Sequence, residues 1–147
     1  MIATQFPILI VEEDMKVFTR MERNLSTHAT GRDMNIVVHH ATSLVGAKIK
    51  TRAYRPYVIS TDMTYLQHDG DKYPLNNIGL SFLAWMKRRP PTKILIYSGE
   101  EPGAIKERLL RSRLYPNEST LPLALQKSYA VSDDKWSRTL LDLLMTR

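Results

Sequence analysis

Residues 57–62 read Tyr-Val-Ile-Ser-Thr-Asp, a short run that delivers one carboxylate, that of Asp62, at its end. The run follows Pro56, which favours an extended approach, and three of its six residues are β-branched, which favours a pleated strand. Ligands of open parallel sheets bind outside the carboxyl ends of the strands. We therefore expect Asp62 to lie at the functional site, with the rest of the chain arranged around it.

The composition suits one compact domain, since the chain has 147 residues and 43% of them are hydrophobic. It contains no cysteine, which excludes a disulfide framework and a thiolate metal site. No apolar run approaches the roughly 20 residues that a membrane-spanning helix needs, and the amino terminus lacks the pattern of a secretion signal. We expect a single domain over residues 1–147 without an output domain, located in the cytoplasm and away from membranes.

Four further runs are apolar or β-branched enough to form strands, at residues 7–11, 35–40, 93–97 and 121–126. The spacing of apolar residues predicts helices at about residues 15–28, 43–53, 78–88 and 102–114, and a last helix from residue 132. Strands that alternate with helices predict an α/β fold, in which right-handed crossovers join a parallel sheet that is covered by helices on both faces.

Local signals refine the predicted helices. Asp14 and Ser132 are expected to cap the amino termini of the first and last helices, because their side chains can accept hydrogen bonds from free backbone amides. In the second helix, Leu44, Val45 and Ile49 are expected to face the core.

The stretch from Thr64 to Asn77 is polar and rich in turn residues, and it predicts a loop longer than most in compact α/β proteins. His68, Asp69 and Asp71 within it resemble a metal cluster, but a polar loop tip explains them better. We treat this loop as an insertion near the site.

The carboxyl ends of parallel strands lie on one edge of the sheet, which brings together Glu12, Glu13, Asp62, Ser98 and Lys127. Crowded acids repel one another unless a cation lies between them, and Mg²⁺ prefers oxygen ligands and phosphate. The predicted chemistry is phosphoryl transfer onto a carboxylate. Asp62 would be the nucleophile, Lys127 would pair with a phosphoryl oxygen, and Ser98 would donate a hydrogen bond to another.

With these residues in order, the chain resembles a response-regulator receiver domain of two-component signalling over almost its whole length. The matching pieces are Ile-Leu-Ile-Val-Glu-Glu-Asp (8–14), Pro-Tyr-Val-Ile-Ser-Thr-Asp (56–62), Ile-Leu-Ile-Tyr-Ser-Gly (94–99) and Leu-Gln-Lys (125–127). The resemblance implies a flavodoxin-like, doubly wound sheet of five parallel strands in the order 2-1-3-4-5. It also implies Mg²⁺-dependent phosphorylation of Asp62 by a histidine kinase or a phosphotransfer protein.

The resemblance assigns the metal to the side chains of Glu12, Glu13 and Asp62 and to the backbone carbonyl of Thr64. Asp62 is then the phosphoacceptor, and the phosphorylated chain is a signalling phosphoprotein that carries an aspartyl phosphate. Such a protein is not a turnover enzyme, and it would at most dephosphorylate itself slowly.

The resemblance also makes Ser98 the switch hydroxyl and Lys127 the conserved-type lysine of the family. Three positions depart from the family pattern. Glu13 is longer by a methylene than the usual aspartate, Ala124 stands where an aromatic switch residue is expected, and Ser128 replaces a proline.

Two functions therefore stay open. The first is a phosphorelay receiver that signals through contacts with a downstream protein, either as a monomer or as a homodimer. The second is a pseudo-receiver, the same fold used as an interaction module without phosphorylation. The net charge of +6 suits an acidic partner. Nucleic acid is not expected as a partner, because no recognition motif accompanies the basic residues of the third and fourth predicted helices.

Overall fold

The computed structural model describes residues 4–128 and 132–146. Its sheet has the parallel strand order β2-β1-β3-β4-β5, as predicted, and helices lie on both faces. The strands are β1 (Phe6–Val11), β2 (Ile36–Ala41), β3 (Val58–Thr61), β4 (Lys93–Ser98) and β5 (Leu123–Gln126). The helices are α1 (Met15–Gly31), α2 (Leu44–Tyr54), α3 (Ile78–Met86), α4 (Pro102–Arg111) and α5 (Asp134–Met145), with a short 3₁₀ turn, η1, at Glu118–Thr120.

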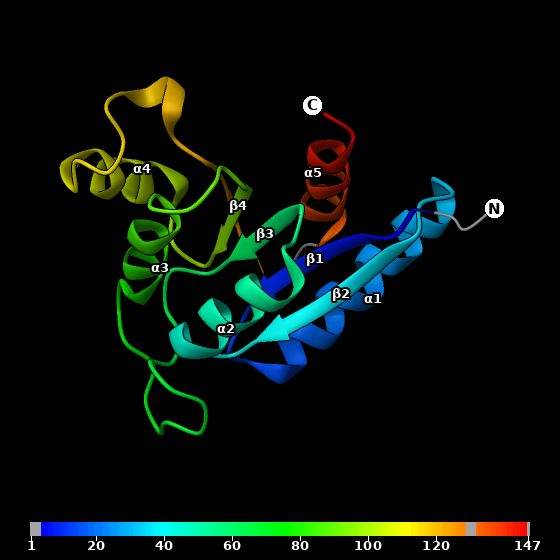
Figure 1. The fold of residues 1–147 in the computed structure, drawn as a ribbon, viewed down its shortest axis with the longest axis horizontal. Helices are drawn as coiled ribbons and strands as arrows, with labels where there is room; N and C mark the ends of the chain where they lie inside the picture. Colours follow the sequence, from blue (N-terminus) through cyan, green and yellow to red (C-terminus); the bar gives the residue numbers. More distant parts are fainter. Residues whose placement is uncertain (1–3, 129–131, 147) are drawn as a thin grey trace.

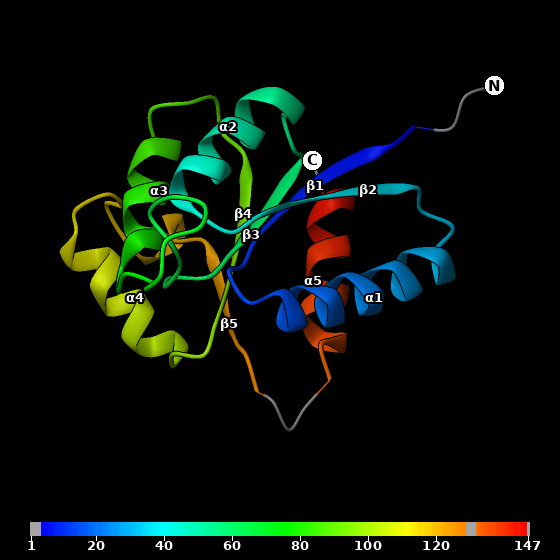
Figure 2. The ribbon, with the colours of Figure 1, turned by 90° about the horizontal axis from the view of Figure 1, so that it is seen from below.

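Helices α1 and α5 cover one face of the sheet, and α2 and α3 cover the other (Figures 1 and 2). The alternation of side chains along β1 explains this division, since Ile8 and Ile10 pack against the α1 and α5 side and Leu9 and Val11 pack against the α2 and α3 side. A strand that is buried on both faces must be apolar throughout. The continuous apolar run of the sequence thus agrees with the place of β1 inside the sheet, between β2 and β3.

Polar contacts fasten α5 to the sheet and to α1. The indole nitrogen of Trp136 donates to the hydroxyl of Ser60 in β3 at 2.8 Å. The hydroxyl of Tyr97 in β4 donates to Asp133 at 2.5 Å, and Arg20 of α1 binds the same carboxylate at 2.7 Å. Since the Asp133 side chain is fully buried, these two donors supply the hydrogen bonds that its charge needs in the core.

The structure corrects the predicted inner face of α2. Leu44 is buried as expected, but Val45 and Ile49 are 36% and 57% exposed. The positions that face the sheet carry small side chains instead, Ala47 and Thr51, which are both buried. The apolar pattern was misleading because α2 packs through small residues, which allow it to approach the sheet closely.

The predicted caps have different outcomes. Asp14 caps α1 as expected, because its carboxylate accepts from the amides of Lys16 and Val17 at 2.9 and 3.3 Å. The prediction for Ser132 was wrong, since Asp133 occupies the position before α5. The Asp133 side chain makes no capping hydrogen bond, because Tyr97 and Arg20 engage it.

The helix ends also differ by a few residues from the prediction. α1 continues to Gly31, whereas α3 and α4 end at Met86 and Arg111, before the predicted positions. None of the helices within the described residues is long and apolar enough to cross a membrane.

Gly79 is required by its position in the first turn of α3. A Cβ atom there would lie 2.6 Å from the carbonyl oxygen of Asp62 and 2.8 Å from the Cα atom of Met63. Both atoms belong to the backbone that follows β3. Any larger residue at position 79 must therefore displace the segment that carries Asp62.

We predict that Gly79→Ala lowers the free energy of unfolding by about 1–3 kcal/mol, the usual cost of overpacking. Gly103→Ala is the matched control, because Gly103 is also the second residue of its helix and its Cβ would meet only the carboxylate of Glu101, at 3.8 Å. Urea unfolding of both variants is the measurement. Equal stability of the two variants would contradict the close packing of α3 on the β3 turn.

Candidate functional site

The carboxyl ends of β1, β3 and β5 bring Glu12, Asp62 and Lys127 together. The ammonium of Lys127 donates to one oxygen of Asp62 at 2.6 Å and also donates to a carboxylate oxygen of Glu12. The three side chains are only 4–14% exposed. One buried cation is thus shared by two buried carboxylates, so the predicted convergence of these three residues is present.

Burial and charge act against each other in this cluster. Burial raises the pKa of the Glu12 carboxyl, and the charge of Lys127 reverses only part of that increase. Burial lowers the pKa of Lys127, but Asp62 and Glu12 together outweigh it and leave the pKa above its ordinary value. Lys127 therefore stays charged, and its charge opposes the effect of burial on the neighbouring Glu12 carboxyl.

Backbone amides hold the remaining carboxylate oxygens. The second oxygen of Asp62 accepts from the amide of Met63 at 2.6 Å, and the second oxygen of Glu12 accepts from the amide of Asp14 at 3.1 Å. The carbonyl of Glu12 also contacts the Nε2 atom of His40 at 2.6 Å. Each carboxylate is thereby fixed in orientation, with one oxygen toward the backbone and one toward Lys127.

Ser98 lies beside this cluster without joining it. It is 2% exposed, and its hydroxyl accepts from the amide of Glu100 at 3.3 Å. Its backbone carbonyl accepts from the amide of Lys127 at 2.7 Å, which fixes the start of the lysine side chain. The predicted switch hydroxyl is therefore adjacent to the site and engaged with the loop after β4.

The donor chemistry suits Mg²⁺, since Glu12 and Asp62 supply carboxylate oxygens. The arrangement does not yet form a metal site, because Lys127 occupies the space between the two acids. Glu13 and Thr64 are both partly exposed, and Glu13 makes no ion pair with the described residues. Within residues 4–128 and 132–146, no three His, Asp or Glu side chains are grouped to hold a metal. A divalent cation would have to compete with Lys127 for Glu12.

The loop residues that resembled a metal cluster instead hold the loop in place. Asp69 accepts from the hydroxyls of Ser43 and Thr42 at 2.5 and 3.2 Å, and the hydrogen bond from Ser43 is the main reason that the pKa of Asp69 is lowered. Asp71 accepts from the amide of His68 at 2.9 Å. These contacts support the prediction of a polar loop tip and fasten the loop to the start of α2.

Sequence reasoning missed Tyr97 and Asp133, which lie beside the site. The ring of Tyr97 lies 5.7 Å from the ammonium of Lys127, and its hydroxyl binds Asp133. Burial, followed by the hydrogen bond to Asp133, raises the pKa of the Tyr97 hydroxyl, so it remains a donor. The only available signal was the position of Tyr97, directly before Ser98 at the end of a buried strand.

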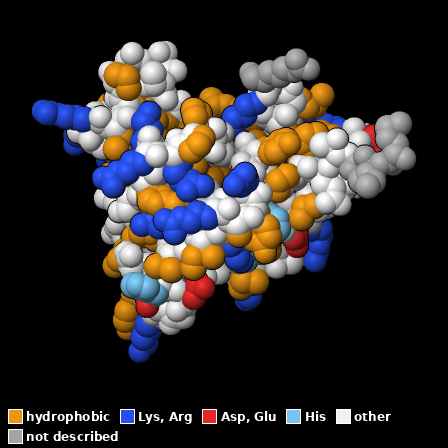
Figure 3. Space-filling view, in the orientation of Figure 1, with side chains coloured by type: hydrophobic (Ala, Val, Ile, Leu, Met, Phe, Trp, Pro, Cys, Tyr) orange, Lys and Arg blue, Asp and Glu red, His pale blue; other side chains and the backbone are white. Residues whose placement is uncertain are grey.

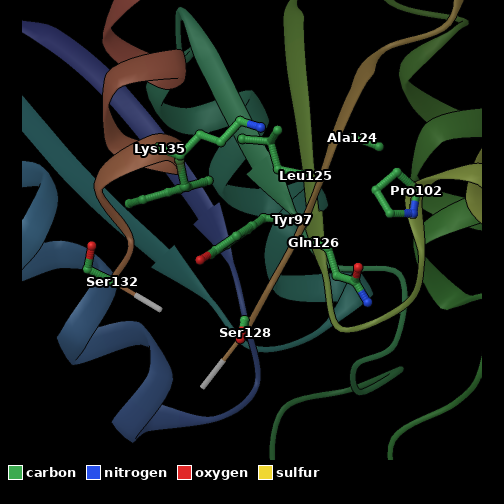
Figure 4. A pocket seen from close by; sticks show the side chains of 9 residues that line it. Tyr97, Pro102, Ala124, Leu125, Gln126, Ser128, Ser132 and Lys135 are labelled. Carbon is green, nitrogen blue, oxygen red and sulfur yellow. The ribbon is translucent and has the colours of Figure 1, made fainter. Parts of the chain in front are cut away.

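A cavity of about 300 Å³ lies between β4, β5 and α5, close to this aromatic residue (Figure 4). Its lining includes Tyr97, Ala124, Gln126, Ser128 and Trp136. The methyl group of Ala124 leaves this part of the β5 surface open, where the resemblance led us to expect a ring. Residues 129–131, which follow Ser128, lie outside the described residues, so the predicted departure of that loop stays a prediction.

Solved structures with the same fold are receiver domains of response regulators. A signal receiver domain of a putative Luxo repressor protein from Vibrio parahaemolyticus is 15% identical, with a TM-score of 0.70 over 97% of this chain and 92% of that one. The chemotaxis response regulator CheY4 of Vibrio cholerae is 17% identical, with a TM-score of 0.68 over 95% and 99% of the two chains.

A putative response regulator from Chloroflexus aurantiacus is 16% identical, with a TM-score of 0.69 over 97% of this chain and the whole of the other. No protein-family model matches the sequence, and no curated protein matches it. At such low identity the likeness establishes the fold alone. The chain has the flavodoxin-like fold of receiver domains, in the strand order that the sequence led us to expect.

We predict that Lys127→Met lowers the free energy of unfolding by about 3 kcal/mol or more near neutral pH, since it leaves two buried carboxylates without a counter-ion. A raised pKa of Glu12 means that the folded protein holds that proton more tightly than the unfolded chain does. The free energy of unfolding then falls as the pH rises through the folded pKa. Removing Lys127 raises that pKa further and deepens the loss.

The loss of unfolding free energy in Lys127→Met should therefore be larger at pH 8 than at pH 5, as measured by urea unfolding. Glu12→Gln in the same chain should restore part of the lost stability. Lys16→Met is the control, because Lys16 is an exposed lysine of α1. A pH-independent deficit would refute the electrostatic explanation.

Proposed function

We propose that this protein is a receiver that accepts a phosphoryl group on Asp62 and signals through protein contacts. The observation that carries the proposal is the buried ammonium of Lys127, shared by Asp62 and Glu12 at the carboxyl edge of a receiver-like sheet. A carboxylate in this position has a nucleophilic oxygen and a mobile positive charge within 2.6 Å of it.

In the reaction, a carboxylate oxygen of Asp62 forms a bond to phosphorus while the bond from phosphorus to the donor breaks, and the electron pair of that bond leaves with the donor. Lys127 is freed from the neutralised carboxylate and pairs with a phosphoryl oxygen. The amide of Met63 holds the other carboxyl oxygen in place. Mg²⁺, bound by Glu12, Asp62, Glu13 and the carbonyl of Thr64, would neutralise charge on the transferred group.

The donor is expected to be a sensor histidine kinase or a phosphotransfer protein, and the reader of the phosphorylated state a downstream protein with an acidic surface. A homodimer of the phosphorylated form is compatible with this role. The protein would accept one phosphoryl group rather than turn over a substrate, with slow self-dephosphorylation at most. This role belongs in the cytoplasm.

A specific observation favours the second function, that of a pseudo-receiver. All four carboxylate oxygens of Glu12 and Asp62 already have hydrogen-bond partners, and Lys127 bridges the two acids. In that case the protein binds its partner without phosphorylation. Partner binding that survives Asp62→Ala would support this alternative, and loss of binding would argue against it.

The test is incubation with Mg²⁺ and either a small phosphodonor, followed by intact mass measurement, or beryllofluoride, followed by amide NMR spectra. We expect an adduct of one phosphoryl group on the wild-type protein and none on Asp62→Asn. Asp71→Asn is the control, because it removes an exposed carboxylate of the neighbouring loop. Absence of any adduct on the wild-type protein, or an adduct that persists in Asp62→Asn, would exclude Asp62 as the phosphoacceptor.

A further inference from the structure

Positive charge is distributed very unevenly along the chain. Residues 44–61 and 72–99 contain nine of the 21 Lys and Arg residues and none of the 15 Asp and Glu residues. The rest of the chain therefore has 12 basic residues against 15 acidic ones and is slightly negative. The net charge of +6 comes entirely from these two segments. The first contains α2 and β3, and the second contains α3 and β4 with the loops on either side of α3.

The basic residues of the two segments differ from the others in their contacts. Elsewhere in the described residues, six Lys and Arg side chains form ion pairs with acids: Arg20, Arg32, Lys106, Arg108, Arg111 and Lys127. None of the nine in these segments is within ion-pair distance of a described Asp or Glu side chain. Within the described part of the molecule, no direct ion pair therefore offsets their mutual repulsion.

The fold gathers several of these charges around one aromatic ring. Lys48 and Arg52 of α2 lie 5.8 and 5.3 Å from the ring of Trp85 in α3, and Arg89 lies 4.8 Å from it. In Figure 3, Lys and Arg side chains are concentrated over the region of α2 and α3, while acidic side chains lie at the lower part and right margin of that face. The aromatic ring stabilises three cations that have no anion of their own.

This basic surface is hollowed at the amino ends of β3 and β4, the edge opposite Asp62. A cavity of about 510 Å³ is lined by Thr51, Arg55, Pro56, Arg89, Pro90 and Thr92. Two further cavities, of about 270 and 400 Å³, also include Thr92 in their linings. The three cavities therefore adjoin one another around Thr92, and we call this hollowed surface the basic groove.

The basic groove also has an aromatic wall. Tyr57 lines its third cavity and is 50% exposed, although it stands directly before the central strand β3. Phe6 packs against it edge to face, with ring centroids 5.5 Å apart. Threonine hydroxyls, arginines and an exposed ring are together the groups that contact phosphates, sugars and bases.

We propose that the basic groove binds single-stranded nucleic acid, with phosphates on Arg55 and Arg89 and a base against Tyr57. Arg52, which shares the ring of Trp85 with Arg89, would contact a further phosphate beside the groove. The uniform sign of the surface favours this occupant, because a nucleic acid carries a negative charge at every residue, whereas protein partners usually present mixed charges. A groove with one exposed ring suits a flexible strand better than a stiff duplex. The sequence did not favour nucleic acid, because no recognition motif accompanies the basic residues. The structure adds a surface that the sequence does not show, since α2 and α3 become neighbours only in the fold.

This activity is independent of the phosphoryl chemistry proposed for Asp62, since it uses the opposite edge of the sheet. The test is fluorescence anisotropy of the full chain with short labelled RNA and DNA strands of mixed sequence, over a series of salt concentrations. We expect saturable binding that weakens steeply with salt, with a logarithmic slope of about −0.7 for each phosphate contact. Asp62→Asn should bind as the wild-type protein does.

The double variant Arg52→Gln, Arg89→Gln should lose about tenfold in affinity, and Tyr57→Leu should weaken binding with little change in the salt slope. The control is Arg23→Gln, Arg138→Gln, which makes the same change in net charge at exposed positions of α1 and α5. Circular dichroism checks that every variant is folded.

Four results would overturn the proposal: no saturable binding, equal losses in the two double variants, tighter binding of duplex than of single strands, or tighter binding of poly-glutamate than of nucleic acid at the same salt concentration. The last result would assign the groove to an acidic protein segment.

Discussion

The structure depends on one charge, the ammonium of Lys127, which is shared between Glu12 and Asp62. It joins the ends of β1, β3 and β5, strands that are far apart in the sequence. Two carboxylates buried side by side would repel each other, whereas a buried cation between them offsets that repulsion and fixes their orientation. The same interaction therefore holds the edge of the sheet together and fixes the position of the Asp62 carboxylate.

A second buried charge, the carboxylate of Asp133, joins separate elements on the face of the sheet that α1 and α5 cover. Asp133 receives hydrogen bonds from Arg20 and Tyr97, and the ring of Tyr97 lies near Lys127. The two charge clusters are thus separated by a single aromatic ring. With Ala124 in β5, the ring that adjoins the site belongs to β4 and points toward α5. Any displacement of Lys127 would therefore first change the packing of α1 and α5, the helices on that face.

The sequence predicted the elements well because buried parallel strands are continuous apolar runs, and the five runs here were separated by clear turn residues. It also predicted the meeting of Glu12, Asp62 and Lys127, because the carboxyl ends of parallel strands lie on one edge of the sheet. The prediction that Val45 of α2 is buried was wrong, because a hydrophobic side chain indicates a preference for burial and does not show how far the helix lies from the sheet. Asp133 could not be recognised, because nothing in the sequence shows which acid will find two donors in the core.

The placement of Trp136 has a consequence for how the protein is made. Its indole donates to the hydroxyl of Ser60, and its ring packs against Tyr97, so α5 completes the face of β3 and β4, two strands that are synthesised before it. A chain synthesised only as far as the end of β5 already contains Lys127 together with Glu12 and Asp62, but the apolar face that carries Tyr97 still lacks its cover. The charged edge of the sheet therefore has all of its residues before α5 closes the core beneath it.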